Sequence, residues 1–165
     1  MEALLNTGTA SASVGLLADH HRELDRQFEE LLALARGGDG EELRRAWTAF
    51  EWSLLRHLDL EESELLPRFA QQDPGGARAI LADHAAIRRE LLELGVSLDL
   101  HLVRSEAVEG LVRRLKDHAR REDAALYPWA GAHVPAARWQ SIGRALSETA
   151  PPPTRTPPKS VGGQP

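Results

Sequence analysis

The histidine and glutamate residues of this chain follow a repeated spacing that suits metal binding. HLDLEESELLP (residues 57–67) and HARREDAALYP (residues 118–128) each begin with His and carry acids four and five residues later, before a closing Leu and Pro. Both His and Glu are usually surface residues. Four residues apart on a helix they share a face, where they form either a surface ion pair or part of a metal site.

The apolar positions of the predicted helices indicate which side these pairs face. At spacings of three and four, His57 and Glu61 follow Trp47, Phe50 and Leu54. Three other segments also place one His on an apolar stripe: His21 with Leu17 and Leu24, His84 with Ile80 and Ile87, and His118, then Glu122, with Leu111 and Leu115.

One inward His is more often a hydrogen-bonded core residue, and one His–Glu pair is more often a surface ion pair. Four inward His and two inward Glu favour a multivalent cation, because burying two uncompensated carboxylates would cost several kcal/mol each.

The donor types narrow the choice of metal. The chain has no Cys, and imidazole with carboxylate suits iron, manganese or zinc. The zinc-protease signature His-Glu-x-x-His is absent from the sequence, and ferritin-type bundles use Glu-x-x-His instead. Two carboxylates among four imidazoles favour a pair of ions bridged by Glu61 and Glu122.

The elements that must position these residues are helices. Periodic segments predict helices from about 13 to 36, 41 to 72, 74 to 94 and 105 to 128, with a short fifth helix after Pro135. Pro67 is expected to kink or end the second of these helices. No segment alternates with period two, so the expected fold is all-α, an up-down-up-down four-helix bundle.

We expect residues 1–12 to be flexible, 13–149 to form the bundle domain and 150–165 to be a disordered Pro-rich tail.

Composition limits the partners. The chain of 165 residues with a net charge of −5 is long enough for one domain and has no basic face for nucleic acid. No apolar run is long enough to cross a membrane. The N-terminus does not resemble a signal peptide, so a cytoplasmic location is expected.

Four motifs together resemble the hemerythrin-like, or HHE cation-binding, domains. They are DHHRELD (19–25), HLDLEE (57–62), DHAAI (83–87) and HARRED (118–123). The resemblance covers roughly residues 13 to 128. It implies a four-helix bundle that holds two non-heme iron ions, oxo- and carboxylate-bridged, and binds oxygen or related small ligands. Carried over by position, the metal ligands would be His21, His57, Glu61, His84, His118 and Glu122.

Two ligand positions have competitors. LADH ends at His20 and again at His84, which favours His20, whereas the apolar positions after it favour His21. Oxygen-carrying hemerythrins place an Asp where this chain has Asp123. That residue lies about 140° around the helix from the preceding His, against about 40° for Glu122. Side-chain direction therefore favours His21 and Glu122.

One position departs from the family pattern. Hemerythrins carry a second His one turn after the third-helix His, and this chain has Arg88 there. A guanidinium cannot bind a metal. We therefore expect Arg88 to turn toward a carboxylate or to hold an anionic ligand, and one iron to keep an open position.

The other aromatic residues and histidines are expected to lie outside the site. His101 and His133 are predicted to be exposed, and Tyr127 to point away from the His118 stripe. Packing roles are expected for Trp52, Trp129 and Trp139.

These observations predict a non-catalytic di-iron protein that binds or senses O2, NO or another small ligand such as peroxide. No catalytic residue and no organic cofactor is expected. The alternatives are a di-iron enzyme that acts on peroxide or NO, and an iron storage or buffering protein.

Overall fold

The computed structural model describes residues 6–37, 40–100, 102–103 and 105–147, which are helical over almost all of their length and contain no strand. The predicted tail at 150–165 lies outside these residues. In chain order the elements are α1 (Asn6–Gly37), α2 (Gly40–Leu60), η1 (Glu61–Leu65), α3 (Leu66–Gln72), α4 (Pro74–Asp99), α5 (Ser105–Arg121), η2 (Glu122–Leu126), α6 (Tyr127–His133) and α7 (Ala136–Leu146).

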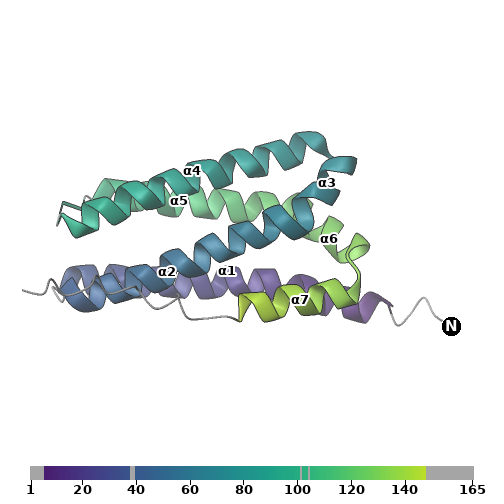
Figure 1. Ribbon diagram of the computed structural model, residues 1–165, viewed down its shortest axis with the longest axis horizontal. Helices are drawn as coiled ribbons and strands as arrows, with labels where there is room; N and C mark the ends of the chain where they lie inside the picture. Colours follow the sequence, from purple (N-terminus) through teal and green to yellow (C-terminus); the bar gives the residue numbers. More distant parts are fainter. Residues whose placement is uncertain (1–5, 38–39, 101, 104, 148–165) are drawn as a thin grey trace, which may run out of the picture.

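The long helices form a bundle. Figure 1 shows α1, α2, α4 and α5 running along the long axis of the molecule, with α3 and α6 gathered at one end. The helix α1 packs against α2, α4 packs against α5, and the short α7 lies on α1 and α2. The predicted all-helical fold and the short helix after Pro135 are both confirmed.

Two helix ends differ from the sequence prediction. The helix α1 begins at Asn6, so residues 6–12, expected to be flexible, are helical. The helix α4 continues through Gly95 to Asp99, although Gly95 was expected to follow its end. A Cβ atom at Gly95 would lie 3.3 Å from Nε1 of Trp47. This glycine therefore allows close approach of α2 inside a continuous helix and does not end one.

Each copy of the repeated motif contains a π-helical segment. In η1 the backbone N–H of Leu66 donates to the carbonyl of Glu61, and in η2 that of Tyr127 donates to Glu122. Each bond spans five residues, where an α-helix spans four. Pro67 and Pro128 follow in the first turns of α3 and α6. Pro67 thus follows a π segment, and the helix continues to Gln72.

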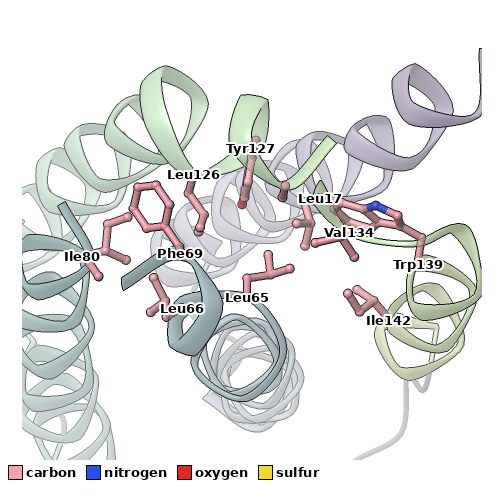
Figure 2. Packing of buried hydrophobic residues seen from close by; sticks show 12 residues of the cluster. Leu17, Leu65, Leu66, Phe69, Ile80, Leu126, Tyr127, Val134, Trp139 and Ile142 are labelled. Atoms are coloured by element: carbon pink, nitrogen blue, oxygen red, sulfur yellow. The ribbon is translucent and has the colours of Figure 1, made fainter. Parts of the chain in front are cut away.

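The core consists of two apolar clusters, and the motif histidines and glutamates form a polar layer beside them. One cluster, shown in Figure 2, joins α1, α3, α4, α6 and α7 through Leu17, Leu65, Leu66, Phe69, Ile80, Leu126, Tyr127, Val134, Trp139 and Ile142. The other includes Leu24, Phe28, Phe50, Leu54, Leu58, Ile87, Leu91 and Leu111. On α1 and α4 a motif histidine falls between members of the two sets, His21 between Leu17 and Leu24 and His84 between Ile80 and Ile87.

No described helix combines the length and the apolar character that crossing a bilayer requires.

Candidate metal centre

All four long helices contribute to the polar layer. It contains five polar residues that are almost completely buried, with exposed fractions of 0 to 3%: His57, Glu61, His84, His118 and Glu122. His21 of α1 joins them and is partly buried. The two glutamates are the first residues of η1 and η2, one turn after their histidines.

One group of donors lies between α4 and α5. Glu61, His84, His118 and Glu122 each place a possible ligand atom within 4.8 Å of the others. Nε2 of His118 lies 3.1 Å from Oε1 of Glu122. Nε2 of His84 lies 3.5 Å from the same oxygen and 3.4 Å from Oε2 of Glu61.

A second group lies between α1 and α2. His21, His57 and Glu122 also place possible ligand atoms within 4.8 Å of one another. The Nε2 atoms of the two histidines are 3.1 Å apart, and Nε2 of His21 lies 3.3 Å from Oε2 of Glu122. Glu122 thus belongs to both groups. Glu61 also spans them, since its Oε1 lies 3.3 Å from Nε2 of His57.

Some of these buried atoms lack hydrogen bonds. Oε2 of Glu61 and both ring nitrogens of His118 are buried without a hydrogen-bond partner. Buried polar side-chain atoms are usually paired, and a cation would give Glu61 Oε2 and the Nε2 atom of His118 a partner. The oxygen and imidazole donors present therefore fit a metal ion of the iron, manganese or zinc type.

The pKa values of Glu61 and Glu122 are shifted in opposite directions. Burial and the neighbouring negative charge of Glu61 raise the pKa of Glu122 well above its ordinary value. Burial also pushes the pKa of Glu61 upward, but the adjacent imidazoles of His57 and His84 outweigh it and hold that pKa well below the ordinary value. Two adjacent buried carboxylates strongly disfavour a doubly ionised state unless positive charge lies between them.

Most of the imidazoles are held neutral, which is the form that binds metals. Burial lowers the pKa of His118 to about 3, and it also lowers the pKa values of His21 and His57. His84 differs. Burial lowers its pKa, but the hydrogen bond with Glu122 and the nearby carboxylate of Glu61 outweigh this effect and raise the pKa to about 10.

A second layer of polar residues supports His84. Its Nδ1 atom lies 2.8 Å from Oε1 of Glu62. Arg88 donates to the same oxygen at 2.5 Å and to Oδ1 of Asp59 at 2.7 Å. Arg88 has therefore turned toward carboxylates, the first of the two arrangements expected from the sequence. An imidazole that ligates a metal commonly bonds a carboxylate through its other nitrogen.

The structure separates the competing residues. His21 lies in the cluster, whereas His20 stacks on His57 with parallel rings 5.0 Å apart. Nδ1 of His20 lies 3.1 Å from Nδ1 of His57, on the side of that ring away from the cluster atom Nε2. Glu122 is buried and Asp123 is exposed.

Tyr127 corrects the sequence prediction. Expected to point away, it is 1% exposed, and its hydroxyl donates to Oε1 of Glu61 at 2.8 Å and lies 3.2 Å from Oε2 of Glu122. The reason is η2. Nine residues of regular α-helix would put Tyr127 about half a turn from His118, but the π-helical segment changes that phase by about one residue. The signal in the sequence was the repeat, since Leu66 and Tyr127 occupy the same place in its two copies.

The remaining predicted residues lie elsewhere. His133 is exposed and stacks on Trp129. Trp129 and Trp139 pack in the cluster of Figure 2, and Trp52 is partly buried on α2. His101 lies outside the described residues.

A pocket of about 210 Å³ reaches the cluster between α1 and α5. His21, His57 and His118 line it together with the apolar side chains of Leu24, Phe28 and Leu54. Exposed charged residues also border this pocket: Asp25, Lys116, Arg120 and Asp123.

Comparison with known proteins agrees with the chemistry of the cluster. No curated protein and no solved structure matches the chain. The model of the family described as hemerythrin HHE cation binding domain matches residues 12–130. That match includes the four motif histidines and both glutamates, and together with the cluster it indicates a metal-binding protein. The chain belongs to the hemerythrin HHE cation-binding domain family.

Proposed function

We propose that this protein holds two non-heme iron ions and binds a small ligand, such as O2 or NO, at an open coordination position. The observation that carries the proposal is the pair of donor groups joined by Glu122. A carboxylate shared by two sets of imidazoles has the arrangement that bridges two ions. Imidazole and carboxylate donors without thiolate suit iron.

Each long helix would then supply one imidazole, in a bundle whose helices alternate in direction. His21 and His57 would hold one ion, and His84 and His118 the other. Glu61 and Glu122 would bridge the pair through their two oxygens. When bound, the ions would supply reversible coordination of a small molecule and one-electron chemistry.

The pocket supports a small ligand. At about 210 Å³ it is below the range of about 300–1,000 Å³ typical of sites for drug-sized molecules. Its apolar wall of Leu24, Phe28 and Leu54 leads to three of the four imidazoles. A diatomic molecule or peroxide fits such a space, and the apolar wall limits the access of water to the ions.

The test is anaerobic loading of metal-free protein with Fe(II), followed by metal analysis and optical titration with NO, azide and O2. The expected result is two irons per chain and a spectrum that changes with each ligand and reverses when O2 is removed. Stoichiometric zinc without iron, after growth in iron-replete medium, would contradict the proposal.

Peroxide distinguishes the competing functions. Rapid oxygen evolution from the iron-loaded protein would identify an enzyme that acts on peroxide. Rapid loss of iron to a mild chelator would identify a storage protein. A stable spectrum with neither response supports a carrier or sensor.

A further inference from the structure

The hydroxyl oxygen of Tyr127 lies among the atoms that the proposed function assigns to metal binding. Besides Glu61 and Glu122, it lies 3.1 Å from Nε2 of His21 and 3.4 Å from Nε2 of His57. The side chain comes from the start of α6, where η2 directs it inward. Figure 2 shows the Tyr127 ring in the apolar cluster that also contains Leu17 and Leu126.

These distances have a meaning in coordination chemistry. Oxygen and nitrogen donors bind such ions at about 2.0–2.2 Å, so two donors at right angles around one ion lie roughly 3 Å apart. The two imidazole nitrogens of His21 and His57 are separated by 3.1 Å. The phenol oxygen lies at similar distances from both, and 3.2 Å from Oε2 of Glu122. It therefore occupies a corner next to three donors that would share one ion.

We propose that the hydroxyl oxygen of Tyr127 is a further protein ligand of the ion held by His21 and His57. The inference rests on the proposed function, because it requires a metal at this site. It adds a phenol oxygen to a site otherwise made of imidazoles and carboxylates.

The two proposed ions then differ in the number of their protein donors. Among the described residues, the ion between His21 and His57 has the phenol oxygen in addition to the shared carboxylates. The ion between His84 and His118 has only the two imidazoles and the carboxylates, because Arg88 is engaged by Glu62 and Asp59. Fewer protein donors therefore surround the ion of His84 and His118.

The rival role for Tyr127 is that of a hydrogen-bond donor. Without metal, its hydroxyl donates to Glu61. Burial and the two carboxylates raise the pKa of Tyr127 well above its ordinary value, so the metal-free phenol keeps its proton. As a ligand of Fe(III), the oxygen exchanges its bond to hydrogen for a bond to the metal, and the proton is released to solvent. As a donor only, it stays a neutral phenol.

The chain makes the test unambiguous because it contains a single tyrosine. Every tyrosinate signal therefore belongs to Tyr127. The iron-loaded, oxidised protein is examined by resonance Raman spectroscopy with visible excitation, and Ga(III), which has no redox chemistry, is added to metal-free protein while near-ultraviolet difference spectra are recorded.

The expected result is a visible charge-transfer band with tyrosinate ring modes, and one tyrosinate per chain on Ga(III) binding. Tyr127→Phe should lose these signals, and the control His133→Ala should keep them. Bound iron without tyrosinate modes would overturn the ligand role alone. A protein that binds no iron would overturn the proposed function as well. If Tyr127→Phe does not fold, the spectra of the unchanged protein still decide.

Discussion

Glu62 connects a buried imidazole to the surface of the molecule. It contacts His84 on one side and accepts a hydrogen bond from Arg88 on the other. Arg88 in turn also holds Asp59. The guanidinium thus fixes the carboxylate that orients the imidazole, although it lies outside the metal cluster.

Replacing Arg88 with Ala should weaken metal binding by about 10-fold, at the low end of the range for residues that support metal ligands. The physical reason is that Glu62 loses the partner that positions it against His84. The measurement is competition with a chelator of known affinity. Arg89→Ala is the control, since Arg89 is the next residue on α4 and is exposed. Equal affinities in the two variants would show that Arg88 does not position the site.

Removing a cluster imidazole should have a larger effect. His57→Ala and His118→Ala should each lose bound metal, because each removes one donor from a buried set. His133→Ala should keep full metal content, since His133 is exposed and contacts Trp129. Metal analysis after identical loading gives the comparison, and equal loss in all three variants would refute the assignment of the cluster.

Individual ligand candidates could be placed from helix geometry alone. The angle of about 40° between His118 and Glu122 predicts a shared face, and Glu122 is buried while Asp123 is exposed. Their roles in metal binding stay predictions. Geometry failed at Tyr127, because the calculation assumed a regular α-helix through residues that form η2.

At the scale of elements, the two π-helical segments explain how the repeated motif buries two adjacent apolar residues. Leu65 and Leu66 are 1% and 3% exposed, and Leu126 and Tyr127 are 0% and 1% exposed. In a regular helix two neighbours lie about 100° apart and seldom share the same inner face. A wider turn, followed by a proline that leaves one carbonyl without its usual donor, allows both to face inward.

The start of α4 offers a test of local helix stability. The Asp73 side chain accepts a hydrogen bond from the backbone N–H of Gly76 at 2.8 Å, and Pro74 follows the cap. Asp73→Ala should destabilise the protein by about 1 kcal/mol through loss of this cap. Urea unfolding of the metal-free protein measures the change, with the exposed Gln71→Ala as control. An unchanged midpoint would mean that the cap adds nothing.

For the whole molecule, apolar periodicity predicted an all-helical fold and the approximate positions of the long helices. It missed the beginning of α1 at Asn6, where small polar residues resembled a flexible lead-in. It also missed the length of α4, because the packing of Trp47 against Gly95 is a tertiary contact that glycine statistics do not reveal. Local signals located the elements, and packing determined their ends.

We expect metal binding in the polar layer to stabilise the fold. In the metal-free protein, burial and the charge of Glu61 disfavour the ionised form of Glu122, and a bound cation would favour that form. Adding Fe(II) to metal-free protein at 100 times the dissociation constant should stabilise it by about 2.7 kcal/mol for each site bound in this way. Anaerobic thermal unfolding should show a rise of several degrees. His118→Ala provides the control and should show a much smaller rise. If Fe(II) does not change the melting temperature of the protein without substitutions, the assignment of these residues to metal binding is contradicted.

Metal bound at the cluster, where four helices meet, would also act as a cross-link between them. The chain has no cysteine, so it cannot tie distant segments together with disulfides. A disulfide that closes a loop of about 100 residues stabilises a protein by up to about 4.7 kcal/mol in the chain-entropy account. A site that holds both His21 and His118 would join positions almost 100 residues apart, and it would close shorter loops between consecutive ligands. Thiols do not break a metal cross-link, whereas a chelator removes it. We therefore expect the stability of this protein to depend on metal supply and not on thiol redox balance.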